Sequence, residues 1–419
     1  MIELVETILT IILIPLVSIQ ISWIILIFLS FFKKPKTKEI KNLPKITILI
    51  PAHNEEKNLP ELIENLNSLD YPKNKIEILI IENGSSDNTY KVAKELEKKY
   101  KNVKAYHLKI SNKSIALNFG LEKTKSEYVL ILDADTRLEK DSLKNSLKYF
   151  VDNVAGVTFS IRVKNKNKII AYFQNAEYMF SNLLRKGLNL LKEGSVYIWG
   201  CAIIYKTKIL KKVKFRELAT EDIDTNLRIQ SLGYKIIYAE DCIGYTEVPE
   251  KLKNFVKQRL RWYSNSFLIL DTYVSNFNKM NKSLKYYSVP FLIFFWLPFS
   301  FIVLPLNAYS ISYWLQYQKT LEDYIIYFIN WFSFFGIING IYKVYIGEWI
   351  LKPIMIFGYA SGIITFFLII FALIYYKQLN PKNFLLPIFS FPYFFFINLL
   401  YVISFIIFLV KSNKMPWLR

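Results

Sequence analysis

Five long stretches without a charged side chain limit what this chain can fold into. One lies near the N-terminus and four lie in the last third: Thr7–Phe32, Tyr286–Gln318, Tyr324–Tyr342, Pro353–Tyr376 and Asn383–Val410. A helix of about 20 apolar residues crosses a bilayer, and the Trp and Tyr residues near these stretches are typical of membrane interfaces. We therefore predict five membrane-spanning helices. The weakest, Tyr324–Tyr342, holds two Asn and two Gly and also suits a helix lying in the membrane plane.

The charged side chains lie between these stretches and predict the topology. The net charge is +20, and residues 33–285 are rich in lysine. Because basic segments stay on the cytoplasmic side, we predict a multi-pass protein of the cell membrane with its N-terminus outside and its C-terminus cytosolic. The predicted parts are a membrane helix at 1–32, a cytosolic domain at 33–249, interface helices at 250–285, about four spans within 286–410, and a cytosolic tail at 411–419.

Composition argues against several other classes of protein. Cys201 and Cys242 are the only cysteines, and their number and spacing indicate neither a disulfide scaffold nor a structural zinc site. The excess of lysine suits an anionic lipid bilayer and phosphorylated substrates. No nucleic-acid-binding signature is present, so we do not expect nucleic acid as a partner.

The cytosolic segment is predicted to be an α/β domain with a mostly parallel sheet. Lys45–Ala52, Ile76–Glu82 and Tyr128–Asp133 are short apolar runs without alternation, and helical patterns separate them. Such strands are buried on both faces, as in parallel sheets that helices cover on both sides. Ligands of these sheets bind at the carboxyl ends of the strands. The residues that follow each run are therefore candidates for a site.

Two carboxylates directly follow the third run. Asp133 and Asp135 stand at positions i and i+2, where the strand opens into a loop. Two such side chains can converge on one hard divalent cation, which would neutralise charge on a phosphate-bearing substrate. A solvated turn or a helix cap is the alternative interpretation.

Three further segments are candidates, each with a purely structural alternative. Lys113 precedes the helical pattern Ser114–Thr124, and it either assists anion binding at a helix N-terminus or is a solvated lysine. Tyr197–Ala202 mixes aromatic and small residues, which suits either a ligand-binding wall or core packing. Thr220–Asp222 precedes another helical pattern, and it either caps that helix or includes a catalytic carboxylate.

A basic pentapeptide, Gln258–Trp262 (QRLRW), precedes the last group of uncharged stretches. Its two arginines can clamp a diphosphate through forked hydrogen bonds. Its Trp offers a flat apolar face to a sugar ring. The alternative is an interfacial membrane anchor.

Taken in order, these segments resemble the family-2 glycosyltransferases. More narrowly, they resemble the membrane-integrated branch that contains the cellulose, hyaluronan and poly-N-acetylglucosamine synthases. The resemblance covers about residues 45–265 and rests on six motifs: Ile50–Glu56 (IPAHNEE), Asn83–Thr89 (NGSSDNT), Lys113–Gly120 (KSIALNFG), Asp133–Asp135 (DAD), Thr220–Asp222 (TED) and Gln258–Trp262 (QRLRW).

The resemblance implies a GT-A fold, Rossmann-like, that binds a nucleotide-diphosphate sugar with Mg²⁺ or Mn²⁺. It places nucleotide-sugar contacts at Ala52, His53, Asn54, Glu55, Asn83, Lys113, Asp133, Arg259 and Arg261, with the two arginines on the diphosphate. It places the metal on Asp135, the general base at Asp222 and the acceptor sugar on Trp262. Gln258, Glu221, Gly200 and Cys201 are expected on the acceptor side.

One position departs from the family pattern. The family usually has Asp before the glycine of the turn, where it contacts the nucleobase, and this chain has Asn83. An amide both donates and accepts hydrogen bonds, whereas a carboxylate only accepts them. UDP stays the predicted nucleotide, with a weaker preference.

The residues fit an inverting transfer. A carboxylate takes the proton of the acceptor hydroxyl, and a metal and arginines stabilise the departing diphosphate. The predicted function is extension of a β-linked polysaccharide at the membrane. The alternatives are transfer of one sugar to a lipid-linked acceptor, and a non-catalytic scaffold or transporter.

Overall fold

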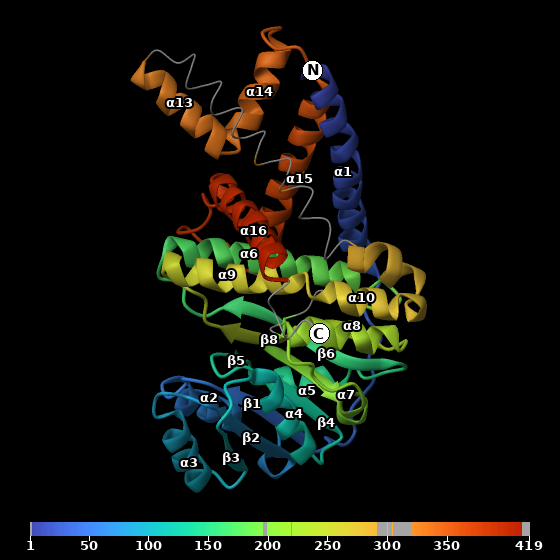
Figure 1. The fold of residues 1–419 in the computed structure, drawn as a ribbon, viewed down its shortest axis with the longest axis vertical. Helices are drawn as coiled ribbons and strands as arrows, with labels where there is room; N and C mark the ends of the chain where they lie inside the picture. Colours follow the sequence, from blue (N-terminus) through green and yellow to red (C-terminus); the bar gives the residue numbers. More distant parts are fainter. Residues whose placement is uncertain are drawn as a thin grey trace.

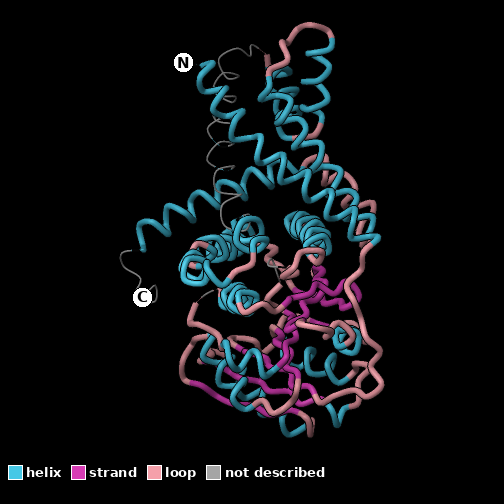
Figure 2. The backbone as a smooth tube through the Cα atoms, turned by 90° about the vertical axis from the view of Figure 1, so that its right-hand side faces the viewer, coloured by secondary structure: helices cyan, strands magenta, loops and turns pink. Residues whose placement is uncertain are grey.

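The computed structural model describes residues 2–195, 199–218, 220–290, 300, 304 and 320–412. A sheet domain lies at one end of the molecule, and the N-terminal helix and several helices from the C-terminal region project from the other end (Figure 1). A layer of helices lies between them. The strands are confined to the sheet domain (Figure 2).

The sheet has eight strands in the order β3-β2-β1-β4-β7-β6-β8-β5. The strands are β1 (Ile46–Ala52), β2 (Ile76–Asn83), β3 (Val103–Leu108), β4 (Tyr128–Leu132), β5 (Arg137–Leu138), β6 (Val154–Val163), β7 (Ala202–Lys206) and β8 (Lys235–Thr246). The first four pair in parallel, which confirms the predicted α/β fold class. The second half is mixed, because β7 runs antiparallel to both β4 and β6.

Helices cover both faces of the parallel half, and this explains the missing alternation in its strands. They are α2 (Asn58–Asn67), α3 (Thr89–Lys99) and α4 (Lys113–Lys123), whereas α5 (Ser142–Leu147) and α7 (Thr207–Val213) pack against strands of the mixed half. In β1, Ile48 and Ile50 join the core that includes α2, whereas Leu49 joins a second core that includes α4. Each strand residue therefore meets an apolar neighbour whichever way it points.

Four helices form or adjoin the intermediate layer: α6 (Ile169–Leu188), α8 (Glu221–Ser231), α9 (Leu252–Ser266) and α10 (Ile269–Asn276). Helix α6 has a buried polar set that includes Gln174, Asn175, Asn182 and Arg185. Asn182 donates to the carbonyl of Ile161 (2.9 Å) and thereby ties α6 to β6. A helix buried on both sides needs such internal partners for its polar groups.

The remaining helices are α1 (Ile2–Phe32), α13 (Leu321–Phe332), α14 (Phe335–Tyr345), α15 (Pro353–Tyr375) and α16 (Ser390–Ser412). Within the described residues, two stretches are helical, long and apolar enough to cross a membrane, Met355–Tyr375 and Ser390–Val410. The described apolar part of α1, Val17–Phe32, is shorter than a full span. The predicted span Tyr286–Gln318 lies largely outside the described residues.

The stretch Tyr324–Tyr342, predicted as one span, consists of two helices. They meet at an angle of 105° and form a third candidate crossing only if the bent pair is taken together. A Cβ at Gly336 would lie 1.8 Å from the carbonyl oxygen of Asn330, so the bend needs glycine there. The prediction of five spans stays a prediction.

Helix α6 joins the sheet domain to the membrane-directed helices, because α1 and α15 both pack against it. The Lys186 ammonium of α6 contacts Glu240 of β8 at 2.5 Å and also the hydroxyl of Tyr375 in α15. It lies 4.6 Å from the centre of the Phe31 ring in α1. One buried cation thus binds three elements together.

Two glycines with positive φ give a matched test of the fold. Gly194 (φ +75°) would place a Cβ 2.1 Å from the backbone oxygen of Ile236, whereas Gly233 (φ +87°) has nothing within 4 Å. Gly233→Ala should cost only the left-handed strain of about 1–2 kcal/mol. Gly194→Ala should lower the melting temperature of the purified protein clearly more, because backbone cannot move aside. Equal shifts for the two variants would contradict this packing.

Candidate active site

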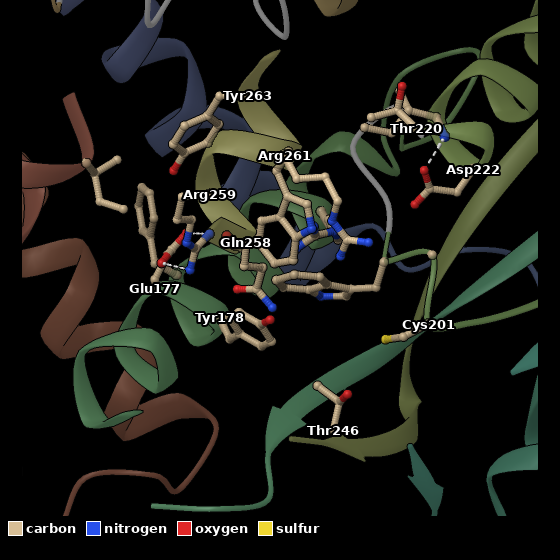
Figure 3. A pocket seen from close by; sticks show the side chains of 18 of the residues that line it. Glu177, Tyr178, Cys201, Thr220, Asp222, Thr246, Gln258, Arg259, Arg261 and Tyr263 are labelled. Carbon is tan, nitrogen blue, oxygen red and sulfur yellow. Dashed lines mark hydrogen bonds and ion pairs between the residues drawn. The ribbon is translucent and has the colours of Figure 1, made fainter. Parts of the chain in front are cut away.

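A cavity of about 350 Å³ lies where the carboxyl end of β4 faces α6, α8, α9 and α16. Figure 3 shows side chains around it from α6, α8, α9 and β8, and from Cys201, which directly precedes β7. It gathers predicted site residues from segments far apart in the sequence: Lys113, Asp133, Asp135, Gly200, Cys201, Glu221, Asp222, Gln258, Arg259, Arg261 and Trp262. The sheet edge predicted from strand ends is therefore one wall of this cavity.

Asp133 and Asp135 follow β4 as the pattern predicted. The Asp133 backbone N–H donates to the carbonyl of Cys201 (3.0 Å), which ties the loop to the approach of β7. Asp135 accepts hydrogen bonds from the hydroxyls of Thr136 (3.1 Å) and Thr246 (3.2 Å). Loss of solvation, followed by the nearby Asp133 carboxylate, raises the pKa of Asp135 to about 7. A nearby positive charge would relieve the repulsion between the Asp133 and Asp135 carboxylates.

Lys113 supplies some of that charge. It begins α4, whose N-cap Asn112 accepts from the Ile115 N–H at 3.2 Å. Its ammonium lies 2.9 Å from Asp133 and 3.0 Å from Glu221. Desolvation opposes the lysine charge, but the attraction of these two carboxylates outweighs it and raises the pKa of Lys113 well above its usual value. Lys113 therefore bridges the Asp133–Asp135 loop and α8.

Asp222 lies in the first turn of α8. One carboxylate oxygen accepts from the Ile223 N–H at 2.8 Å. Thr220 occupies the N-cap position, as predicted, but makes no side-chain cap hydrogen bond. Loss of solvation and the neighbouring Glu221 raise the pKa of Asp222 to about 7, against the opposing effect of Lys113. A carboxyl group with that pKa can both lose and accept a proton near neutral pH.

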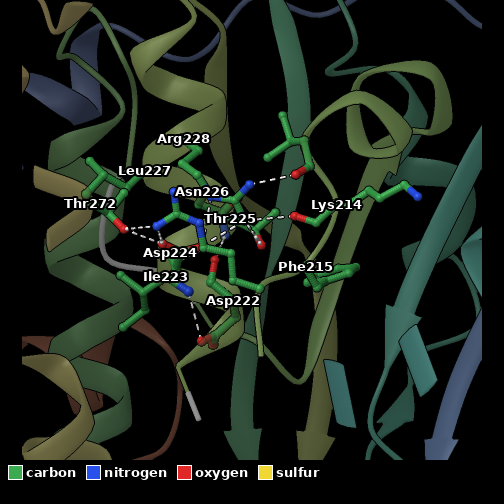
Figure 4. A network of polar contacts seen from close by, with 12 residues as sticks. Lys214, Phe215, Asp222, Ile223, Asp224, Thr225, Asn226, Leu227, Arg228 and Thr272 are labelled. Carbon is green, nitrogen blue, oxygen red and sulfur yellow. Dashed lines mark hydrogen bonds and ion pairs between the residues drawn. The ribbon is translucent and has the colours of Figure 1, made fainter. Parts of the chain in front are cut away.

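A polar network behind Asp222 fixes α8 (Figure 4). Asp224 is fully buried and contacts Arg228 at 2.8 Å and the hydroxyl of Thr272 in α10. Arg228 in turn donates to the carbonyls of Val213 (2.6 Å) and Lys214 (2.8 Å). These charge-assisted bonds hold the helix that carries Asp222.

The predicted nucleotide contacts on β1 and β2 form a neighbouring cluster that does not line this cavity. His53 contacts the Asn83 carbonyl through Nδ1 at 2.9 Å. Asn54 has a positive φ of 59° and accepts from the Ser86 N–H at 2.8 Å. Glu55 donates its N–H to Thr89 (2.7 Å), and Ala52 is buried at the strand end. The cluster shares the sheet edge with Asp133 and Asp135.

Arg259, which is predicted to contact the diphosphate, is paired with a carboxylate in this structure. Its two terminal nitrogens donate to Glu177 of α6, at 2.9 Å and 2.8 Å. Only 2% of the residue is exposed. A buried guanidinium needs such a carboxylate partner, and the contact of Arg259 with the diphosphate stays a prediction. Arg261, two residues on, lines the cavity.

Glu177, Tyr178 and Thr246 also line the cavity, although they belong to none of the predicted motifs. The available signal for Glu177 was its position as the single charged residue in the stretch Ile169–Phe180. The wall also includes Trp23 of α1 and Tyr401 of α16, which no motif indicated. These residues belong to elements that only the tertiary structure brings together.

A sheet with acidic loops at its strand ends, a bridging lysine and a carboxylate at a helix start defines a GT-A type of sugar transferase. Residues 47–214 match the family described as Glycosyl transferase family 2. Residues 47–214 therefore form a domain of the family-2 glycosyltransferase type.

Two curated relatives agree with this assignment. The protein named "Probable glycosyltransferase YdaM" of Bacillus subtilis (strain 168) is 28% identical over 316 residues, which cover 70% of this chain and 75% of that protein. A poly-beta-1,6-N-acetyl-D-glucosamine synthase of Staphylococcus epidermidis is 30% identical over 267 residues, which cover 61% of this chain and 64% of that synthase. The match therefore spans less than two thirds of the synthase.

A solved structure shares the fold. The mannosyltransferase PcManGT from Pyrobaculum calidifontis, in complex with GDP-Man and Mn²⁺, superposes with a TM-score of 0.57 at 19% identity. The superposition covers 88% of this chain and 98% of that protein. At this identity the likeness concerns the fold alone.

Gly200 gives a direct test of the Asp222 position. A Cβ at Gly200 would lie 2.0 Å from the Asp222 carboxylate oxygen, so Gly200→Ala should displace that carboxylate. We expect sugar transfer to fall about 100-fold, as for a misplacement of about 1 Å, while calorimetric donor binding persists. Gly358→Ala, with nothing within 4 Å of its Cβ, is the matched control. Full activity of Gly200→Ala would show that Asp222 does not need this position.

Proposed function

We propose that this chain is a membrane-integrated inverting glycosyltransferase that extends a β-linked polysaccharide from a nucleotide-diphosphate sugar. The carrying observation is the placement of Asp222 in one cavity with Lys113, Asp133, Arg261 and Trp262. The relatives named as polysaccharide synthases support the same reaction class. A non-catalytic scaffold would not need these charges around one cavity.

Asp222 is proposed as the general base. With a pKa of about 7 it accepts the acceptor proton while the hydroxyl attacks the anomeric carbon. The bond from that carbon to the diphosphate oxygen breaks on the opposite side, so the configuration inverts. Arg261 and Lys113 are proposed to stabilise the charge that develops on the leaving diphosphate. Trp262 is proposed to carry the acceptor sugar, with Gln258, Glu221, Gly200 and Cys201 nearby.

Asp135, with Asp133, fits a divalent cation. The two carboxylates share one loop, and their repulsion contributes to the raised pKa of Asp135. Among the described residues no three His, Cys, Asp or Glu side chains gather as a metal site, so diphosphate oxygens would complete the ligand set. When bound, Mg²⁺ or Mn²⁺ neutralises charge on the diphosphate.

Chelation tests this assignment. Excess EDTA should abolish transfer by the purified protein, and added Mg²⁺ or Mn²⁺ should restore it, because the two aspartates otherwise repel the diphosphate. The measurement is initial rate against free cation concentration. Transfer that persists in excess EDTA would contradict a metal at Asp135.

Transfer of a single sugar to a lipid-linked acceptor is the second candidate. The observation in its favour is the part of the cavity wall that Trp23 of α1 and Phe394 and Tyr401 of α16 provide. These aromatic side chains come from helices directed toward the membrane. They suit an acceptor that reaches the cavity from the bilayer.

The nucleotide and the topology also belong to this proposal. Asn83 and His53 sit at the end of β1 and β2, where a nucleobase would bind, and we propose UDP as the carrier. We further propose a cytosolic sheet domain, an external N-terminus and a cytosolic C-terminus, because most of the basic residues lie in segments 33–285 and 411–419.

A donor panel with product analysis by mass tests the proposed function. Wild-type protein should transfer from a UDP-sugar and give a ladder of products, whereas a single added sugar would favour the second candidate. Asp222→Asn keeps the shape but cannot accept the proton, so transfer should fall by about 10²- to 10⁴-fold. Unchanged transfer in Asp222→Asn would remove it as base. No transfer from any donor by wild type would contradict the function.

A further inference from the structure

Arg259 is a charged side chain that the proposed reaction leaves without a direct role. It lies on α9 inside the Gln258–Trp262 motif, and both its terminal nitrogens pair with Glu177 of α6. Desolvation opposes its charge, but Glu177 outweighs this and keeps the pKa of Arg259 well above its usual value. A bidentate pair fixes the plane of the guanidinium as well as its position.

A third helix completes the arrangement. The Tyr393 hydroxyl of α16 donates to the same Glu177 carboxylate. The Tyr393 ring stacks on Phe173 of α6 with centroids 5.2 Å apart and planes at 9°. Phe255 of α9 also packs against Tyr393 at 5.8 Å. Glu177 is therefore the point where α6, α9 and α16 meet.

The guanidinium connects this point to the proposed acceptor platform. The Arg259 guanidinium carbon lies 4.5 Å from the centre of the Trp262 ring, one helical turn further along α9. Cation–π contacts of this kind orient an indole ring. Trp262 lines the cavity and the Arg259 guanidinium lies over its ring, so we expect the position of Arg259 to limit the tilt of that ring.

We propose that Glu177 and Tyr393 are positioning residues for the acceptor, which act through Arg259 to hold the Trp262 ring. This inference rests on the proposed function, in which Trp262 carries the acceptor sugar. It makes α16, a helix able to cross the membrane, part of acceptor binding. Lys113, Asp133 and Asp135 come from elements other than α6, α9 and α16, so donor binding through them does not use this chain of contacts.

The test uses the full-length protein in lipid nanodiscs with UDP-N-acetylglucosamine and a β-1,6-linked N-acetylglucosamine oligosaccharide. Tyr393→Phe keeps the stacked ring and loses one hydrogen bond, so acceptor KM should rise about 3- to 10-fold. Glu177→Gln should raise it at least about 10-fold. In both variants donor KM and the slow hydrolysis of donor without acceptor should stay as in wild type.

Tyr376→Phe is the matched control. Its hydroxyl is also buried and contacts the Tyr238 hydroxyl at 3.2 Å, away from Arg259. This variant loses a comparable hydrogen bond and should leave acceptor KM unchanged. An equal rise in Tyr376→Phe and Tyr393→Phe would overturn the proposal, because it would indicate general loosening.

A double-mutant cycle tests whether Glu177 acts through Arg259. In an Arg259→Met background, Glu177→Leu should raise acceptor KM no further, since both variants remove the same link. Fully multiplicative effects would overturn the proposal. The double variant replaces both members of the buried ion pair by apolar side chains, which is often tolerated. It can therefore be measured even if Glu177→Gln does not fold.

Different results would contradict the proposed function and the positioning role of Glu177 and Tyr393. If wild type transfers nothing from any donor, the proposed function is wrong. If wild type transfers normally and acceptor KM is unchanged in Tyr393→Phe and Glu177→Gln, only the positioning role is wrong.

Discussion

The arrangement of the site depends on the repulsion among its carboxylates and on Lys113, which relieves it. Asp133, Asp135, Glu221 and Asp222 line a common cavity. Lys113 contacts Asp133 and Glu221 at about 3 Å, so it draws α8 toward the end of β4. Without this cation, like charges would push the helix and the loop apart. Such excess negative charge fits the divalent cation that we propose for this site.

The buried polar side chains of α6 connect the sheet domain to the apolar helices through hydrogen bonds. Asn182 bonds to β6, Lys186 to β8 and α15, and Glu177 to α9 and α16. Apolar packing alone is non-directional. The hydrogen bonds therefore fix how the helix layer is rotated over the sheet, and with it the direction in which α9 presents Arg261 and Trp262.

Local patterns predicted the parallel half of the sheet and the residues at its strand ends. Continuous apolar runs and the topology rule were enough to place Asp133 and Asp135 at the edge of a site. The partner of Arg259 was not predictable, because nothing near QRLRW in the sequence points to Glu177 in another helix. The bend within Tyr324–Tyr342 was not predicted for a similar reason. Hydropathy reflects composition, whereas the bend depends on the close approach of Gly336 to Asn330.

The order in which the helices join the cavity has a consequence for how the protein matures. Trp23 of α1 and Tyr401 of α16 line the same cavity, although they come from opposite ends of the sequence. Contacts between such distant segments form late, because the loop they close is long. A ribosome-bound chain that has completed its sheet still lacks one wall of the cavity. The cavity therefore has its full wall only once α16 has been synthesised and has packed against α9.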